Sequence, residues 1–272
     1  MEFDFAAGSL PILVSMPHAG SALPATLAAR LTASARASTD SDWHLPRLYD
    51  FLGAMGASTL AARQSRYVID VNRPPEDTNL YPGMDTTGLC PLDSFAREPL
   101  YLPGLAPDAA EVAQRLTLYW QPYHQQLQAE LDRLLAQHGA VVLWEAHSIA
   151  SRVPRFFDGR LPDFNIGTFD GAACGGGLAE ALLAPVPPAF STALNGRFKG
   201  GYITRRYGRP QQGVHAIQLE MCQCLYMNEP DMDPLLLQGA DATPLAYRPD
   251  LAAAIRPLLQ AMVGAAVDWV RQ

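Results

Sequence analysis

Two apolar, strand-like runs each end in a histidine, and this pair constrains the fold of the 272-residue chain more than any other feature. Residues 140–148 end in Glu145, His147 and Ser148, and residues 11–20 contain His18 at the end of a similar run. Continuous apolar runs are typical of strands buried in a parallel sheet. In open α/β sheets, ligands bind beyond the carboxyl ends of the strands. The sequence therefore favours a metal site on which the two histidines converge.

Strand-like runs alternate with amphipathic helical patterns along the chain. The predicted strands are residues 12–16, 59–62, 67–71, 141–144, 165–169 and 216–221. The predicted helices are 45–55, 109–137, which Pro122 should kink, and 249–270. This alternation predicts an α/β fold with a mostly parallel or mixed sheet flanked by helices. We expect one domain over residues 1–272.

Residues 74–107 break the alternation. They are rich in Pro, Gly, Asp and Thr and show little periodicity, so we expect a long loop excursion over an edge of the sheet. Long ordered loops of this kind are often functional lids, although the sequence does not decide whether this one closes over a substrate. Residues 184–212 are similar, with glycines between aromatic and basic residues.

Charge and composition limit the partners. The net charge of −7 argues against nucleic acid and anionic membranes, because phosphate binding needs a basic surface. No uncharged apolar run approaches the roughly 20 residues that span a bilayer, the N-terminus lacks a basic signal region, and four cysteines do not make a disulfide framework. We expect a soluble, cytoplasmic protein. No feature predicts its oligomeric state.

The residues at the strand ends match a catalytic zinc site. Such a site commonly uses two histidines and one carboxylate and leaves a fourth position for water. His18 and His147 can supply the imidazoles, and the turn 39–43 can supply the carboxylate through Asp40 or Asp42. Aspartates before a helix often cap it instead, but with two of them one can cap while the other binds metal. Zn²⁺ suits this set, and Co²⁺, Fe²⁺ or Mn²⁺ can occupy similar sites.

Two glutamates occur inside apolar strands, where a carboxylate is costly unless it is paired or functional. Glu220 is our candidate general base, the group that takes a proton from the attacking water. Glu145 falls on the same side of its strand as His147, so it can support the metal site or serve as a spare ligand.

Arginines that follow or interrupt strands are candidates for binding substrate carboxylates. They occur in the segments 70–74, 151–155 and 200–205. Surface salt bridges are the alternative role for each arginine. The sequence contains neither of the glycine-rich motifs that bind nucleotide phosphates, so nucleotide binding has no support.

Seven segments together resemble the N-formylglutamate amidohydrolase family. They are SMPHAG (15–20), TDSDW (39–43), SRYVIDVNRP (65–74), EAHSI (145–149), LPDFNIGT (161–168), GGYITR (200–205) and QLEM (218–221). The resemblance implies the phosphorylase/hydrolase-like α/β fold, which also includes zinc carboxypeptidases and aspartoacylase. It implies metal-dependent hydrolysis of N-formyl-L-glutamate to formate and L-glutamate, a step of histidine breakdown.

The resemblance also assigns roles to residues. It places the metal-binding histidines at His18 and His147 and the catalytic glutamate at Glu220. The small acidic substrate that it implies needs cationic partners, and our candidates are Arg73, Arg152 and Arg205, with Asn72 as a polar helper. The acidic ligand falls on the turn with Asp40 and Asp42, because the position at which aspartoacylase-like relatives carry a glutamate is Ser21 here. We prefer Asp42, because it directly precedes the helix, as in related formylglutamate hydrolase-like sequences. One rival is a zinc amidohydrolase or carboxypeptidase acting on another N-acyl amino acid or peptide. A second rival is a non-catalytic protein that binds a metal or an acidic ligand.

Overall fold

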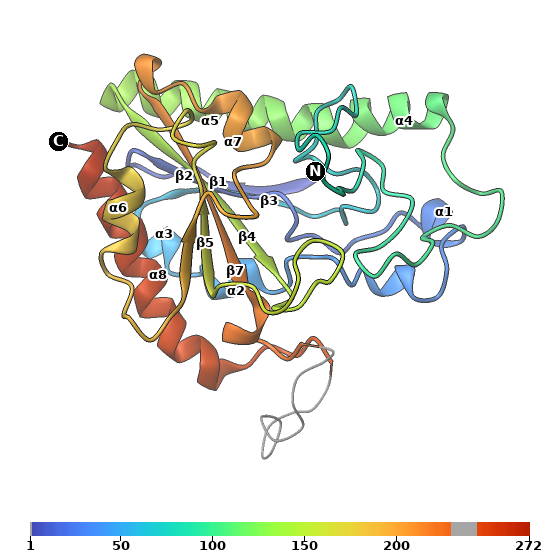
Figure 1. Cartoon of the computed structure of the whole chain (residues 1–272). Helices are drawn as coiled ribbons and strands as arrows, with labels where there is room; N and C mark the ends of the chain where they lie inside the picture. The colour runs from blue at the N-terminus through green and yellow to red at the C-terminus, as the bar shows by residue number, and fades with distance from the viewer. Residues whose placement is uncertain (1, 230–243) are drawn as a thin grey trace.

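The computed structural model describes residues 2–229 and 244–272 of the chain. In these residues, one seven-stranded sheet forms the centre of the molecule, with the strand order β1-β3-β2-β4-β7-β5-β6 (Figure 1). The strands are β1 (Phe3–Ala6), β2 (Ile12–Met16), β3 (Ser58–Ala62), β4 (Val141–Ile149), β5 (Phe164–Gly167), β6 (Thr192–Leu194) and β7 (Val214–Cys222).

The four central strands, β3, β2, β4 and β7, run parallel, while β1 pairs antiparallel to β3 and β5 pairs antiparallel to β7. The edge strand β6 pairs parallel to β5. The predicted mixed sheet flanked by helices is thus confirmed. The parallel strands β2 and β4 are wholly buried, which explains why they are continuous apolar runs. The short strands β1 and β6 at the two edges carry no such signal and escaped prediction.

The predicted strand at residues 67–71 was wrong. The segment consists of turns, and its apolar side chains Tyr67 and Val68 pack in a separate small cluster with Leu27, Leu31 and Leu100. The buried carboxylate of Asp70 accepts a hydrogen bond from the backbone N–H of Asn72, which stabilises a turn at this point. Burial, and not pairing within the sheet, accounts for the apolar pattern.

Helices cover both faces of the sheet (Figure 1). They are α1 (Ala25–Ala28), α2 (Leu45–Leu48), α3 (Leu52–Met55), α4 (Ala109–Arg115), α5 (Gln121–His138), α6 (Leu178–Leu183), α7 (Tyr202–Tyr207) and α8 (Pro249–Val270). The predicted helix 45–55 is interrupted between α2 and α3. The predicted helix 109–137 continues from α4 to α5 through a π-helical turn at Leu116–Trp120, directly before Pro122. Proline cannot donate a helical hydrogen bond, so a distorted turn is expected there.

The sheet separates two cores. On one face α5 and α7 pack against it, and on the other face α2, α3, α6 and α8 do so. Helix α8 is the one helix in the described residues that is long and apolar enough to cross a membrane. Its side chains Leu259, Met262 and Val263 are fully buried against the sheet, as in the core helix of a globular domain.

The order of the strands creates a place for a ligand. After β2 the chain forms β3 on one side of it, and the later strand β4 pairs on the other side. A crevice opens at the carboxyl ends of strands where the winding changes direction in this way. His18 follows β2, and His147 lies near the end of β4, so both flank this point.

Residues 74–107 contain no helix or extended strand, as expected for a loop excursion. Several contacts fasten the loop to the rest of the molecule. The Arg155 guanidinium pairs with Asp85 and Asp93, and the Tyr81 hydroxyl donates to the carbonyl oxygen of Gly200. In this structure the loop forms a wall beside the carboxyl ends of the strands.

His124 connects helix α5 to the segment that carries Asn72. Its Nε2 donates to the carbonyl oxygen of Val71 at 2.8 Å, and its Nδ1 accepts from the Tyr207 hydroxyl at 2.9 Å. Its ring stacks on Trp120 with centroids 3.7 Å apart. Burial lowers the pKa of His124 to about 4, so the folded state holds this ring neutral.

The low pKa predicts how stability depends on pH. Because the unfolded chain protonates His124 near pH 6.5, the unfolded state binds more protons below that pH, and acid favours unfolding down to about pH 4. Between pH 7 and pH 5, His124 should lower the free energy of unfolding of the wild type by about 2 kcal/mol. The His124→Gln variant should not show this part of the decrease. Urea unfolding of both proteins at the two pH values measures this. An equal loss in wild type and variant would contradict it.

Candidate active site

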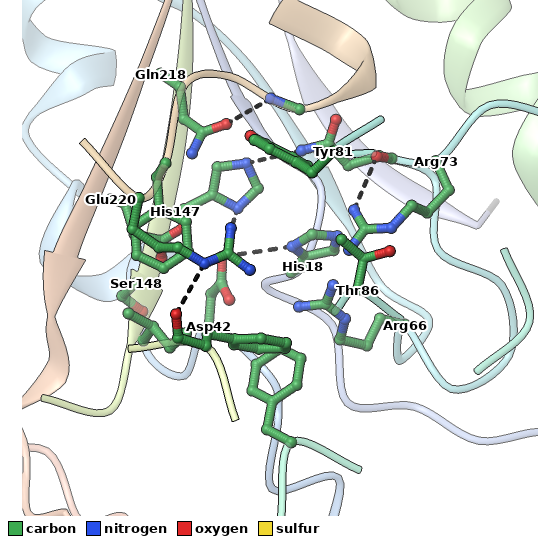
Figure 2. Close-up of a pocket in the computed structure, with 17 residues that line it drawn as sticks. His18, Asp42, Arg66, Arg73, Tyr81, Thr86, His147, Ser148, Gln218 and Glu220 are labelled. Atoms are coloured by element: carbon green, nitrogen blue, oxygen red, sulfur yellow. Dashed lines mark hydrogen bonds and ion pairs between the residues drawn. The ribbon is translucent and has the colours of Figure 1, made fainter. Parts of the chain in front are cut away.

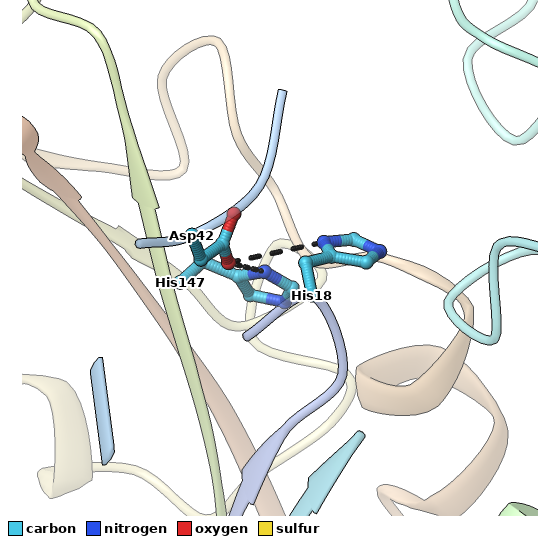
Figure 3. Close-up of side chains that lie close together, drawn as sticks. All are labelled: His18, Asp42 and His147. Atoms are coloured by element: carbon cyan, nitrogen blue, oxygen red, sulfur yellow. Dashed lines mark hydrogen bonds and ion pairs between the residues drawn. The ribbon is translucent and has the colours of Figure 1, made fainter. Parts of the chain in front are cut away.

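Two histidines and an aspartate meet at the carboxyl ends of β2 and β4 (Figure 3). One ligand atom from each of His18, Asp42 and His147 lies within 4.8 Å of the others, and all three side chains are buried. The Asp42 Oδ2 atom is 3.0 Å from His147 Nδ1 and 3.9 Å from His18 Nδ1. Both Nδ1 atoms therefore point toward one carboxylate oxygen.

The opposite ring nitrogen of each histidine contacts a second carboxylate. His18 Nε2 is 2.7 Å from Asp70 Oδ1, and His147 Nε2 is 2.7 Å from Glu145 Oε1. Carboxylates accept hydrogen bonds, so each Nε2 carries the proton, and in a neutral ring Nδ1 keeps its lone pair. Histidine ligands of metal ions are commonly held in this way by a carboxylate behind the ring.

These residues fit a divalent metal ion. The group offers two imidazole nitrogens and a carboxylate oxygen, a donor set suited to zinc and other first-row metals. The carboxylates of Asp42, Asp70 and Glu145 are buried around the two rings. Burying several negative charges together is costly unless cations offset them, and a divalent ion would do so.

The charges around the two rings differ. Burial and the nearby Arg66 lower the pKa of His18 despite its contact with Asp70, which keeps its ring neutral as a metal ligand must be. Burial also disfavours a charged His147, but the Glu145 and Asp42 carboxylates raise its pKa well above the usual value. Burial alone would raise the pKa of Asp70, yet Arg66, His18 and Arg73 hold it well below its ordinary value.

Local backbone contacts place Asp42 beside His18. The Asp42 backbone N–H donates to the carbonyl oxygen of His18 at 2.9 Å, and the Ser41 hydroxyl donates to that of Gly20 at 3.0 Å. Gly20 is required at this point, because a Cβ atom there would lie 2.3 Å from the backbone of Arg63. Asp40 points elsewhere and accepts from the backbone N–H of Phe95.

Glu145 is fully hydrogen-bonded behind His147. Its Oε1 accepts from His147 Nε2 and the Asn72 side chain, and its Oε2 accepts from the backbone N–H and the hydroxyl of Thr204. The Asn72 Oδ1 in turn accepts from the backbone N–H of Ile203. Gly201 lets Asn72 approach, since a Cβ atom would lie 2.4 Å from Asn72 Nδ2. These contacts fix the orientation of Glu145 and, through it, His147.

Glu220 lies beside this candidate metal-binding group. It is the register partner of His147 in the β4–β7 pair, and it lines the pocket that also contains His18 and Asp42 (Figure 2). Among the described residues, its carboxylate makes no hydrogen bond or salt bridge, although only 8% of the residue is exposed. Burial raises the pKa of Glu220 to about 8, which leaves it able to exchange a proton near neutral pH.

The pocket contains three arginines. Arg66, Arg73 and Arg197 line it, together with Tyr81, Phe156 and Phe198 from the surrounding loops. Arg66 is buried and donates to Asp70 through Nη2, and its Nε has no hydrogen-bond partner among the residues that the structure describes. Arg73 donates to the carbonyl oxygens of Thr87 and Asn72.

The structure brings together most of the residues expected from the sequence. His18, Asp42, His147, Glu220, Asn72 and Arg73 line one pocket, with Glu145 directly behind His147. Two of the expected arginines lie outside this pocket. Arg152 lines a neighbouring pocket, and Arg205 donates to the carbonyl oxygens of Gly200 and Leu80, which connects α7 to the 74–107 loop.

Sequence reasoning missed Arg66, Asp70 and Arg197. Asp70 lies in the segment interpreted as a strand, where an aspartate within an apolar run was a signal of a buried, paired carboxylate, and Arg66 directly precedes that segment. Arg197 lies in the glycine-punctuated segment 184–212, which has no periodicity from which its direction could be deduced.

Comparisons with known proteins agree with this geometry. The sequence profile of the N-formylglutamate amidohydrolase family matches residues 10–227. The chain belongs to this family. It is 50% identical to N-formylglutamate deformylase of Pseudomonas aeruginosa, covering 99% of this chain and 97% of that protein. It is 48% identical to N-formylglutamate deformylase of Pseudomonas putida, covering 98% and 96%. The family resemblance seen in the sequence is thus confirmed.

Solved structures show the same fold. The N-formylglutamate amidohydrolase of Ralstonia eutropha JMP134 superimposes with a TM-score of 0.79 at 25% identity, covering 99% of this chain and 98% of that one. A gene product of Agrobacterium tumefaciens superimposes with a TM-score of 0.71 at 21% identity, over 99% and 96% of the two chains. At 21% identity, the similarity to the Agrobacterium tumefaciens protein shows only that the two chains share a fold.

The carboxylates behind the histidines should control metal affinity. We expect Asp70→Asn and Glu145→Gln each to weaken zinc binding about 10- to 100-fold, because the histidine loses the partner that orients it and fixes its proton on Nε2. Competition with a chromophoric chelator measures the affinity. Asp108→Asn is the control, since Asp108 caps α4 and makes no contact with the site. Unchanged affinity in both test variants would contradict the assignment.

Proposed function

We propose that the protein hydrolyses the amide bond of N-formyl-L-glutamate to give formate and L-glutamate. The observation that carries the proposal is the position of Glu220, an unpaired buried carboxylate, beside the group of His18, Asp42 and His147. Membership of the N-formylglutamate amidohydrolase family and the names of the two Pseudomonas relatives supply the substrate. The pocket's arginines suit an acidic substrate.

His18, Asp42 and His147 would hold the metal ion, with zinc as our first choice. Bound there, a divalent ion would polarise the formyl carbonyl group and lower the pKa of a water molecule. The protein's own residues do the remaining work. Asp70 and Glu145 keep the Nδ1 atoms of the two histidines available.

Glu220 transfers the proton in this scheme. It takes a proton from the water that attacks the formyl carbon and returns it to the amide nitrogen as the C–N bond breaks. The products are formate and the free amine of L-glutamate. A carboxylate without other hydrogen bonds suits this role, because a side chain held by several donors would be a weaker base.

Arg66 is our candidate for stabilising the negative charge that develops on the formyl oxygen. It is a buried cation that lines the pocket, and its Nε has no partner in the described structure. The Asp70 carboxylate holds the other end of the guanidinium in place. A donor fixed in advance at the developing charge contributes more than one that must reorient.

The first test measures formate release from N-formyl-L-glutamate, before and after chelation and after addition of zinc. We expect turnover that is lost with the metal and restored by it, because the proposed chemistry requires the ion. N-acetyl-L-glutamate and N-formyl-L-methionine serve as comparison substrates and should react much more slowly. Equal or faster turnover of either comparison substrate would contradict the substrate assignment. So would the absence of formate from metal-loaded protein.

A second test removes the proposed base. Glu220→Gln should lower kcat by about 10²- to 10⁴-fold while the protein still binds metal, because the amide has nearly the same shape and cannot accept the proton. Steady-state kinetics and metal analysis on the same preparation measure both quantities. Glu180→Gln, on the exposed face of α6, is the matched control. Retention of wild-type kcat in Glu220→Gln would reject the role.

The cellular setting belongs to the same proposal. All four cysteines are free, a state typical of a reducing compartment. We therefore propose that the enzyme acts in the cytoplasm.

A further inference from the structure

Arg197 differs from the other two arginines of the pocket in its surroundings. Arg66 lies 2.5 Å from a carboxylate oxygen of Asp70, and Arg73 lies 3.7 Å from the same carboxylate. Among the described residues, Arg197 has no carboxylate within ion-pair distance. It is half-buried, so water does not fully solvate its charge. A cation in such a position is stabilised when an anionic ligand binds beside it.

The Arg197 guanidinium is held in a fixed position. Its Nε donates to the carbonyl oxygen of Phe156 at 2.9 Å, and its Nη2 donates to that of Asp85 at 3.1 Å. The rings of Tyr81, Phe156 and Phe198 lie 5.3–5.5 Å from its central carbon. Its Nη1 makes no hydrogen bond within the described residues. The side chain is therefore oriented before a ligand arrives, with donor capacity still unused.

The contacts that hold Arg197 come from segments that carry none of the candidate metal ligands. Phe156 follows β4 by several residues, and Asp85 belongs to the 74–107 loop. Arg73, in contrast, adjoins Asn72, whose side chain contacts both Glu145 and His147. The α-carboxylate of N-formylglutamate lies nearer the scissile nitrogen than the side-chain carboxylate does. We therefore match Arg73 to the nearer group and Arg197 to the more distant one.

We infer that Arg197 binds the side-chain carboxylate of the substrate and thereby selects for an acidic side chain over its neutral amide. This inference rests on the proposed function, because it names the group that the same pocket recognises. A substrate with an uncharged side chain would leave the Arg197 guanidinium without a counter-charge. Binding such a substrate is therefore penalised, in addition to lacking the ion pair. The formyl group is small and cannot supply this selectivity.

The test compares wild-type and Arg197→Met proteins, both metal-loaded, on N-formyl-L-glutamate and N-formyl-L-glutamine. We expect wild type to prefer the glutamate substrate by on the order of 100-fold in kcat/KM. Arg197→Met should lose most of that preference by slowing the glutamate substrate, with the glutamine substrate changed by less than about 3-fold. Arg197→Lys should recover part of the preference, because it restores the charge without the fork of donors.

Two results would overturn the inference. One is an unchanged preference in Arg197→Met, or its loss in Arg152→Met instead. The other comes from the α-amide, N-formyl-L-isoglutamine. If Arg197→Met abolishes discrimination against this compound and keeps discrimination against N-formyl-L-glutamine, Arg197 binds the α-carboxylate. Thermal unfolding and metal content of each variant show whether the fold and the metal site are intact.

A binding measurement separates this inference from the proposed function. Calorimetry with L-glutamate and L-glutamine on metal-loaded protein involves no turnover. If wild type prefers L-glutamate and Arg197→Met does not, the role of Arg197 is supported. A simultaneous absence of formate release would then contradict the proposed reaction only. If formate is released and both proteins distinguish the two amino acids equally, the role of Arg197 is contradicted and the proposed reaction is retained.

Discussion

Two buried histidine–carboxylate pairs determine the organisation of this site. Asp70 holds His18 and Glu145 holds His147, each through the Nε2 of the ring. Metal binding requires neutral rings, and a neutral imidazole can donate from only one nitrogen. With Nε2 as the donor in each ring, both Nδ1 atoms would then be available to a metal ion on the side of Asp42. Without its carboxylate partner, either ring could rotate or change tautomer, and its Nδ1 atom would no longer be held toward Asp42.

The fold brings these pairs together from distant parts of the sequence. Parallel strands β2 and β4 end at the same edge of the sheet, and the pairing of β4 with β7 sets Glu220 beside His147. The carboxylates behind the rings come from different sources. Glu145 lies in β4 itself, while Asp70 lies in a turn that follows β3. Arg66 and Arg73 offset part of the buried negative charge, and a metal ion would offset more.

The sequence predicted the parts of the site that belong to regular structure. His147 and Glu220 lie in long buried strands, and His18 follows another, so apolar runs located all three. Their convergence follows from a general property of parallel sheets. The turn by itself left Asp40 and Asp42 open, because a turn without periodicity does not reveal which carboxylate points inward, and the family resemblance favoured Asp42. The hydrogen bond from the Asp42 backbone N–H to the His18 carbonyl oxygen joins the two loops and places Asp42 beside His18.

The arginines were harder to predict, because loops carry them. Arg205 was expected in the pocket but donates to two backbone carbonyls, a role that no sequence pattern marks. Arg197 reaches the pocket from an irregular segment, and its direction depends on contacts with Phe156 and Asp85, which are far from it in sequence. Tertiary contacts of this kind are outside what local patterns encode.

The most direct test of the account is a crystal structure of the zinc-loaded protein with the ion located by anomalous scattering. The account predicts one ion bound by Nδ1 of His18, Nδ1 of His147 and a carboxylate oxygen of Asp42, with metal–nitrogen distances of about 2.0–2.1 Å. Asp70 and Glu145 should still contact the two Nε2 atoms. An ion bound through either Nε2, or bound at another place in the molecule, would contradict the account.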